Sequence, residues 1–261
     1  MLKTLLSVTG VYKMYEKWLR HQVKTGGVVP EHIAIILDGN RRWASEKALN
    51  PWVGHHFGAD KIRNLLDWCL ELKVKSITLY AFSTENFQRP KHEVKEIMKI
   101  AEEKLREVLT DEGIHENEVR VKVIGRRNLL PPSLQRLISE AEDATRNYSE
   151  HFLNLALAYG GRAEIVDAAK KIAQKIENGE LSPDVINEQV FENHLYTAHL
   201  PKQDPDLIIR TSGEERLSGF LIWQCAYSEL CFLDVYWPDF RHIDLLRAVR
   251  TYQRRKRRFG A

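Results

Sequence analysis

The sequence predicts an α/β fold in which an open parallel sheet is flanked by helices. Short apolar runs typical of buried strands alternate along the 261 residues with longer stretches that carry apolar residues at helical spacing. A helix between two strands lets the second strand run parallel to the first. There is no repeat and no second domain boundary, so one core is expected after a short N-terminal segment.

The clearest strand covers residues 33–37, a run of apolar residues that predicts a strand buried on both faces. It is followed directly by Asp38, Gly39, Asn40, Arg41, Arg42 and Trp43. A carboxylate and a glycine turn at the end of a buried parallel strand are typical of ligand sites in open α/β sheets. Taken alone, the stretch fits a helix cap after an Asx turn as well as it fits an anion site.

The other elements follow from apolar periodicity and from proline and glycine breaks. Strands are expected over residues 76–82, 119–124, 152–159, 207–209 and 229–233. Helices are expected over residues 42–48, 54–73, 92–112, 131–148, 163–176 and 244–258, with a looser helical stretch over 179–201. The strand at 119–124 alternates valine with arginine and lysine, which places it nearer an edge of the sheet.

Residues 1–24 have the amphipathic pattern of a helix, and glycines and a proline before residue 31 predict a linker to the main domain, residues 31–261. Apolar residues fall close to one helical face, and lysines and an arginine add positive charge. Two interpretations remain open: a helix that lies in a membrane interface, or a helix packed on the domain or on a partner. The apolar side is formed by Leu5, Val8, Tyr12, Tyr15 and Leu19, with Trp18 beside them.

Composition and cysteine use narrow the class of protein. The three cysteines form no C-x-x-C pair, which favours buried thiols and a cytoplasmic location, peripheral at the membrane if the N-terminal helix binds lipid. No run approaches the roughly 20 apolar residues of a membrane-spanning helix, and no secretory signal is expected. Basic residues gather over 247–258 without a base-reading motif, so anionic lipid is a better partner for them than nucleic acid.

Polar side chains follow four of the predicted strands at the point where each strand ends. They are Asp38-Gly39-Asn40, Ser83-Thr84-Glu85-Asn86, Tyr159-Gly160-Gly161-Arg162 and Arg210-Thr211-Ser212-Gly213. Because the carboxyl ends of parallel strands meet at one edge of a sheet, these groups are expected to lie together. Arginines and glycine loops suit diphosphates, and a carboxylate beside phosphates suits Mg²⁺. The common nucleotide motifs G-x-x-x-x-G-K and G-x-G-x-x-G are absent.

A set of longer stretches carries a specific resemblance. They are Asp38-Gly39-Asn40-Arg41-Arg42-Trp43, Gly54-His55, Tyr80-Ala81-Phe82-Ser83-Thr84-Glu85-Asn86-Phe87, Arg89-Pro90, Tyr159-Gly160-Gly161-Arg162, Arg210-Thr211-Ser212-Gly213-Glu214, Arg216-Leu217-Ser218 and Trp237-Pro238-Asp239-Phe240. In order and spacing, over residues 32–259, they resemble the cis-prenyltransferases, the family of undecaprenyl diphosphate and dehydrodolichyl diphosphate synthases. Arg41 and the Thr-Ser-Gly-Glu-Glu-Arg stretch are more similar to archaeal and eukaryotic members than to bacterial ones.

The resemblance implies a parallel six-stranded sheet with a hydrophobic tunnel, in a homodimer whose catalytic domain is residues 31–261. It implies a transferase that adds isopentenyl diphosphate to an allylic prenyl diphosphate and forms cis double bonds. The product would be a cis-polyprenyl diphosphate, the precursor of a lipid carrier. Mg²⁺ would be the cofactor.

By the same resemblance, Asp38 would place Mg²⁺ at the allylic diphosphate and promote the departure of that group. Arg210, Arg216 and Ser218 would hold the diphosphate of isopentenyl diphosphate. Glu229 would be a metal ligand that reaches the site of the partner subunit.

Asn86 occupies the position to which the family assigns proton removal. An amide is a poor base, so we expect Asn86 to position or relay while a phosphate oxygen takes the proton. The other residues that the resemblance places at the substrates are Gly39, Asn40, Arg41, Arg42, Trp43, His55, Ser83, Thr84, Glu85, Phe87 and Arg89.

The sequence departs from the family pattern at Pro51, where an arginine for the donor diphosphate is usual. This departure motivates an alternative in which the same fold uses an atypical prenyl donor or an alcohol acceptor. An alternative of another class is a non-catalytic subunit of a heteromeric prenyltransferase, although such subunits lose the aspartate and arginines that are present here. Trans-prenyltransferases use paired aspartates, and this chain has no Asp-Asp pair.

Overall fold

The computed structural model describes residues 10–255 and contains a six-stranded sheet whose neighbouring strands are all parallel. The strands are β1 (His32–Ile36), β2 (Ser76–Ser83), β3 (Val119–Ile124), β4 (His151–Tyr159), β5 (Leu207–Arg210) and β6 (Glu229–Phe232). Their order across the sheet is β3-β4-β2-β1-β5-β6. The predicted fold class is confirmed, and the half-exposed strand β3 lies at an edge as expected.

The helices differ from the predicted ones mainly at their ends. They are α2 (Val11–Thr25), α3 (Asn40–Glu46), α4 (Pro51–Glu71), α5 (Lys91–Val108), α6 (Glu112–Glu116), α7 (Pro132–Thr145), α8 (Gly161–Glu177), α9 (Glu188–Glu192) and α10 (His242–Arg254). Helix α4 begins at Pro51 rather than Gly54, because proline fits the first position of a helix. The helix predicted over 92–112 ends at Val108, and a separate helix, α6, begins at Glu112 with Asp111 as its N-cap.

Strand β1 is buried on both faces, as its apolar run predicts. On one face Ile33 and Ile35 join a core that includes side chains of α4, α5, α7 and α10. On the other face Ala34 and Ile36 pack with a smaller cluster around Phe220. The loop that follows β1 therefore starts from a strand with packed layers on either side of it.

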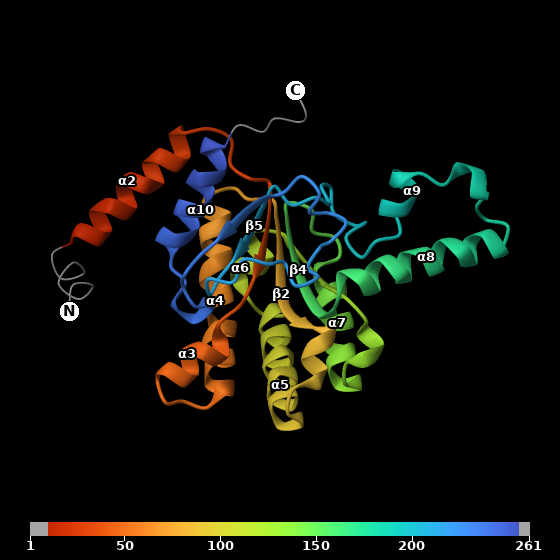
Figure 1. Ribbon diagram of the computed structural model, residues 1–261, viewed down its shortest axis with the longest axis horizontal. Helices are drawn as coiled ribbons and strands as arrows, with labels where there is room; N and C mark the ends of the chain where they lie inside the picture. Colours follow the sequence, from red (N-terminus) through yellow and green to blue (C-terminus); the bar gives the residue numbers. More distant parts are fainter. Residues whose placement is uncertain (1–9, 256–261) are drawn as a thin grey trace.

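Helix α2 lies along α10, and its side chains Leu19 and Val23 are fully buried (Figure 1). Packing on the domain, one of the two interpretations of the N-terminal helix, is thus confirmed for residues 11–25. Leu5 and Val8 of the predicted helix lie outside the described residues. None of the helices in the described part of the chain is long and apolar enough to cross a membrane.

Helices α3 and α4 approach closely because two glycines of α4 face Asn40. A Cβ at Gly54 would lie 2.1 Å from the backbone oxygen of Asn40, and a Cβ at Gly58 would lie 2.3 Å from its side-chain oxygen. Neither space can hold a methyl group. The contact therefore fixes the position of the turn between β1 and α3.

We expect Gly54→Ala to lower the melting temperature by roughly 3–10 °C, because overpacking typically costs about 1–3 kcal/mol. The variant should also lose activity, since α3 must shift away from α4. Gly113→Ala is the matched control, because its Cβ would meet one side-chain atom, Asp111 Oδ1 at 3.1 Å, and no backbone within 4 Å. Thermal unfolding followed by circular dichroism measures both, and equal melting temperatures for the two variants would contradict this account.

Candidate active site

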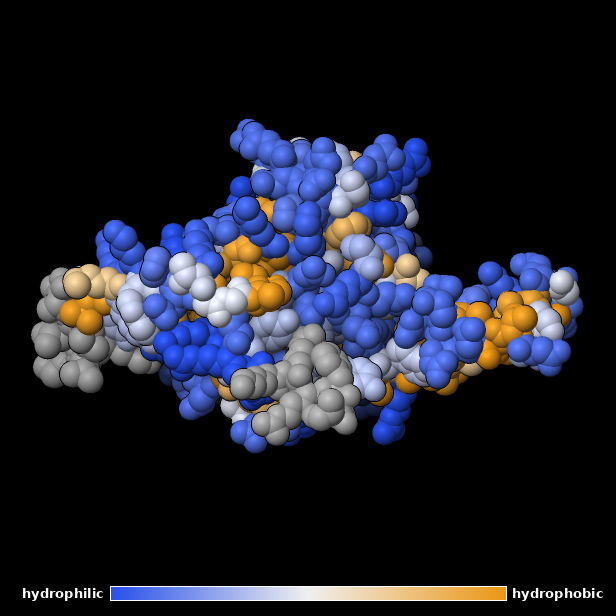
Figure 2. Space-filling model, turned by 90° about the horizontal axis from the view of Figure 1, so that it is seen from above, coloured by the Kyte–Doolittle hydropathy of each residue, from blue (hydrophilic) through white to orange (hydrophobic). Residues whose placement is uncertain are grey.

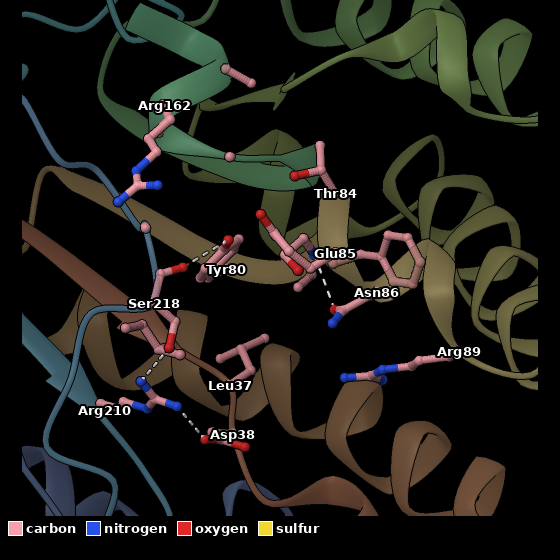
Figure 3. Close-up of a pocket in the computed structure, with 18 of the residues that line it drawn as sticks. Leu37, Asp38, Tyr80, Thr84, Glu85, Asn86, Arg89, Arg162, Arg210 and Ser218 are labelled. Carbon is pink, nitrogen blue, oxygen red and sulfur yellow. Dashed lines mark hydrogen bonds and ion pairs between the residues drawn. The ribbon is translucent and has the colours of Figure 1, made fainter.

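A cavity of about 770 Å³ opens at the carboxyl ends of β1, β2, β4 and β5. Asp38, residues 83–86, residues 160–162 and Arg210 all contribute to its wall. Figure 3 shows labelled side chains from each of these strand ends around the same space. The structure thus brings the four predicted strand ends together.

Asp38 and Arg210 form an ion pair in this cavity. One terminal nitrogen of Arg210 donates to Asp38 Oδ2 at 2.8 Å, and the other donates to Ser218 Oγ at 2.9 Å (Figure 3). The parallel pairing of β1 with β5 sets this meeting, because it places Ile36 beside Arg210. The Arg210 side chain is only 6% exposed, so its charge is held in a largely water-free position.

The Asp38 carboxylate is ionised at neutral pH. Burial raises its pKa, but the hydrogen bond and charge of Arg210, with hydrogen bonds from Ser212 and Gly39, outweigh burial and lower the pKa below its usual value. The Gly39 N–H donates to Oδ1 at 2.7 Å. Gly39 has a φ of +99°, and a Cβ there would lie 2.6 Å from the Tyr236 ring, so this turn requires glycine.

Arg42 and Arg216 lie on either side of Glu214. Arg42 is 3.2 Å from one Glu214 oxygen and 3.4 Å from Asp38 Oδ1. Arg216 is 2.6 Å from the other Glu214 oxygen, and its side chain is mostly exposed. Neither arginine lines the cavity itself. Glu214 pairs with both guanidinium groups, and Asp38, which does line the cavity, pairs with that of Arg42.

A buried carboxylate that the sequence analysis missed, Glu93 of α5, gathers three side chains that were predicted to contact the substrates. Glu93 is 2% exposed. Its Oε1 lies 3.2 Å from His55 Nε2, 3.2 Å from a terminal nitrogen of Arg89 and 3.7 Å from Arg41 Nε. The available signal was its spacing, four residues after Arg89 and in the first turn of a helix.

Burial has a clear effect on two of these groups. It lowers the pKa of His55 despite the hydrogen bond that the ring donates to Glu93, so the imidazole is largely neutral at pH 7. Burial also lowers the pKa of Arg89, which nevertheless remains charged because a guanidinium starts from a very high value.

Asn86 and Ser83 lie at the end of β2, around a short 3-10 helix, η1 (Thr84–Gln88). Asn86 Oδ1 accepts a hydrogen bond from the Ser83 N–H at 3.1 Å. The amide oxygen is thereby engaged, and the amide nitrogen is the group left for a substrate. This geometry favours a positioning role for Asn86 over proton removal.

The remaining predicted substrate residues divide into two groups. Thr84, Glu85 and Asn40 line the cavity. Phe87 and Trp43 do not line it, and each packs against a neighbouring phenylalanine ring. Contact of these two aromatic residues with a substrate stays a prediction.

Glu229 lies away from Asp38 of the same chain. It opens β6 in register with Leu207, the first residue of β5, whereas Arg210 is the last. Its carboxylate pairs with Arg255 at 2.6 Å. The structure does not bring Glu229 to the cavity of its own chain, and a role in a partner's site stays a prediction.

An apolar passage continues from the cavity between the sheet, α4 and α5. A second cavity of about 100 Å³ adjoins the first, and a third of about 260 Å³ adjoins the second. The first two share Leu37, Asn40, His55 and Ala81, and the last two share Ala59, Ile62, Lys104 and Leu155. The predicted hydrophobic tunnel corresponds to this series of adjoining cavities.

Asp38 and Glu85 supply the carboxylates in the wall of the large cavity. No group of three or more His, Cys, Asp and Glu side chains within residues 10–255 is arranged to hold a metal. Mg²⁺, however, often uses one or two protein carboxylates and completes its shell with substrate phosphates and water. The ionised Asp38 side chain, 28% exposed, fits that kind of site.

Three comparisons place these features among known proteins. A family model described as "Putative undecaprenyl diphosphate synthase" matches residues 36–260. The tritrans,polycis-undecaprenyl-diphosphate synthase (geranylgeranyl-diphosphate specific) of Methanopyrus kandleri is 54% identical over 98% of this chain and 93% of its own. Its counterpart in Methanocaldococcus jannaschii is also 54% identical, over 98% and 91%.

A solved structure agrees with these sequence matches. The lavandulyl diphosphate synthase from Lavandula x intermedia, in complex with dimethylallyl diphosphate, has a TM-score of 0.84 and 39% identity over 89% of this chain and 99% of its own. The six-stranded sheet, the motifs at its carboxyl edge and the near full-length relatives agree. The chain belongs to the cis-prenyltransferase family and is an enzyme that transfers prenyl groups to elongate prenyl diphosphates.

Proposed function

We propose that this enzyme condenses isopentenyl diphosphate with an allylic prenyl diphosphate and repeats the step to make a long cis-polyprenyl diphosphate. The observation that carries the proposal is the Asp38–Arg210–Ser218 group in a polar cavity that adjoins an apolar passage. A diphosphate needs cations and hydrogen-bond donors, while a prenyl chain needs an apolar space. Both lie side by side here.

The arrangement supports a defined division of work. The allylic diphosphate would lie beside Asp38 and Arg42, where fixed positive charge stabilises the negative charge that develops as it departs. Mg²⁺ held by Asp38 and the phosphates would act there as a Lewis acid. Arg210 and Ser218 would hold isopentenyl diphosphate, and the Asn86 amide would donate to it. A phosphate oxygen would accept the proton that is lost.

Arg162 lines the same cavity and is a residue that the sequence analysis did not assign to a substrate (Figure 3). Within residues 10–255 it forms no ion pair with a carboxylate. We expect Arg162→Gln to raise the KM for isopentenyl diphosphate by about tenfold with kcat little changed, since a charged hydrogen bond contributes roughly 1.5–3 kcal/mol. Steady-state kinetics checks this against Arg146→Gln, an exposed control, and an unchanged KM would remove Arg162 from the site.

The allylic primer we propose is geranylgeranyl diphosphate, because the relatives that match almost the whole chain are named as specific for it. Pro51, which motivated an atypical donor or an alcohol acceptor, is the first residue of α4 and is absent from the cavity wall. Incubation with labelled isopentenyl diphosphate and a panel of allylic diphosphates, with and without alcohols, tests the choice. Products extended on geranylgeranyl diphosphate support the proposal, whereas a product that contains the alcohol would support the alternative.

We also propose a homodimer. Helix α8 and the segment with α9 form an arm that stands away from the sheet (Figure 1), and Figure 2 shows apolar surface on it. Val166, Val185 and Ile186 are each more than 40% exposed. A second copy on the arm would cover them, and Glu229 could then serve the partner's metal. Light scattering should show a dimer that Val185→Asp with Ile186→Asp weakens, and a wild-type monomer would contradict this.

We also propose that the enzyme is cytoplasmic and contacts the membrane surface through the outward face of α2. Met14 is 73% exposed and Trp18 is 44% exposed, with the Arg250 guanidinium 4.6 Å from the Trp18 ring. Apolar side chains beside cations suit an anionic lipid surface, and the product is itself a lipid. Sedimentation with anionic vesicles should recover wild type and lose Met14→Glu, and equal recovery of the two would contradict the contact.

A further inference from the structure

Helix α4 is tied to α5 and to the start of α6 by one hydrogen bond and two ion pairs that lie along the apolar passage. They are His55–Glu93 at the large cavity, Lys104–Asp60 where the two smaller cavities adjoin, and Arg63–Asp111 at the last cavity. The first belongs to the diphosphate site. The second stands where only a prenyl chain would pass.

Lys104 lies at the narrow part of the passage. It is the charged residue, among those that the structure describes, that lines both the cavity of about 100 Å³ and the cavity of about 260 Å³. Its other shared neighbours, Ala59, Ile62 and Leu155, are apolar. The lysine stem therefore forms part of an apolar wall.

The ammonium group of Lys104 is held at the surface by two carboxylates. Its Nζ lies 2.7 Å from Asp60 Oδ1 on α4 and 2.8 Å from Glu107 Oε1 on its own helix. Asp60 is 68% exposed and Glu107 is 57% exposed, whereas Lys104 is 28% exposed. The side chain thus lies with its stem inward and its charge outward, a common arrangement of lysine at apolar surfaces. Asp60 gives it an anchor on the opposite helix.

We propose that the Lys104–Asp60 ion pair limits how far α4 and α5 separate at the narrow part of the passage, and thereby limits the length of the prenyl chain that the enzyme makes. The inference rests on the proposed chain elongation and concerns a different property of it. A chain that grows beyond the cavity of about 100 Å³ must pass Lys104 to reach the cavity of about 260 Å³. Moving α4 away from α5 widens this point of passage and stretches the ion pair.

The test replaces each partner without changing its size greatly. Lys104→Met keeps an apolar stem and removes the charge, and Asp60→Asn removes the charge on α4. Each variant should raise the ratio of longer to shorter products by roughly two- to fivefold, the factor that corresponds to about 0.4–1 kcal/mol for an exposed pair. The double variant should match the single ones, because both remove the same link. Product lengths are read by mass spectrometry at fixed primer and excess isopentenyl diphosphate.

Lys99→Met is the matched control. Lys99 also lies on α5 and pairs at 2.7 Å, but with Glu96 of the same helix, and it lines neither cavity. If Lys104→Met and Asp60→Asn give the product distribution of wild type or of Lys99→Met, or shift it toward shorter chains, the inference is wrong although elongation stands. If wild type makes no elongated chain, the proposed function and the inference are both wrong.

Discussion

Asp38→Asn is expected to lower kcat by about 10²- to 10³-fold while the protein stays folded, a loss typical of removing one electrostatic group from a reacting site. The amide keeps the shape of the side chain and an oxygen that can accept the Arg210 hydrogen bond of 2.8 Å. It removes the negative charge that would bind Mg²⁺. Incorporation of labelled isopentenyl diphosphate measures the rate, and circular dichroism confirms the fold.

The matched control for this variant is Asp143→Asn, since Asp143 is a mostly exposed partner of Arg146. It should retain the wild-type rate. An Asp38→Asn enzyme with more than about a tenth of wild-type kcat would remove Asp38 from the mechanism, because that loss is below the range expected for such a group.

The lowered pKa of Asp38 also predicts how the free energy of unfolding of wild type and of Asp38→Asn depends on pH. In the unfolded chain the carboxyl titrates near 3.8, and in the folded protein it titrates lower. Its ionisation therefore stabilises the fold above 3.8, and this contribution disappears as the pH falls through the folded value. Urea unfolding should show wild type losing its advantage over Asp38→Asn as the pH falls below about 4. A constant difference would contradict the ion pair with Arg210.

Glu93→Gln is expected to lower kcat/KM by roughly 10²-fold, because charged hydrogen bonds contribute about 1.5–3 kcal/mol each. The variant keeps the volume of a side chain that is 2% exposed but leaves His55, Arg89 and Arg41 without their shared anion. The Arg41 and Arg89 guanidinium groups then repel each other, and all three side chains lose their common position. Steady-state kinetics with both substrates should show a larger change in KM than in kcat, as expected for a positioning residue.

Glu96→Gln separates this role from a general effect of charge on α5. Glu96 lies one turn further along the same helix and pairs with Lys99 at 2.7 Å, outside the cavity. It should have wild-type kinetics. If Glu93→Gln resembles Glu96→Gln, the arrangement of His55, Arg89 and Arg41 does not depend on Glu93.

The features that the sequence predicts well are those that depend on local pattern. The apolar run at 33–37 predicts a buried strand, and the polar residues after it predict the turn where the strand ends. Both predictions need only the local sequence. Parallel pairing then brings Asp38 to Arg210, because alternating strands and helices allow few other arrangements. The sheet, its edge strand and the assembly of the strand ends could therefore be predicted.

The features that the sequence does not show depend on where side chains point after packing. Glu93 meets His55 across 38 residues of chain, and no local pattern indicates that contact. Trp43 and Phe87 occur in the motifs, yet both pack outside the cavity wall. Helix ends also differ from the prediction, as at Pro51, because a proline can follow the end of one helix or open the next.

The most direct test of the central claim is the product of the wild-type enzyme with geranylgeranyl diphosphate, excess isopentenyl diphosphate and Mg²⁺, analysed by mass spectrometry and by NMR of the new double bonds. The account predicts a series of diphosphates that grow by five-carbon units, each with a new cis double bond, and no products once the metal is chelated. A single condensation without further growth, trans double bonds, or no extended product from any allylic diphosphate would contradict it.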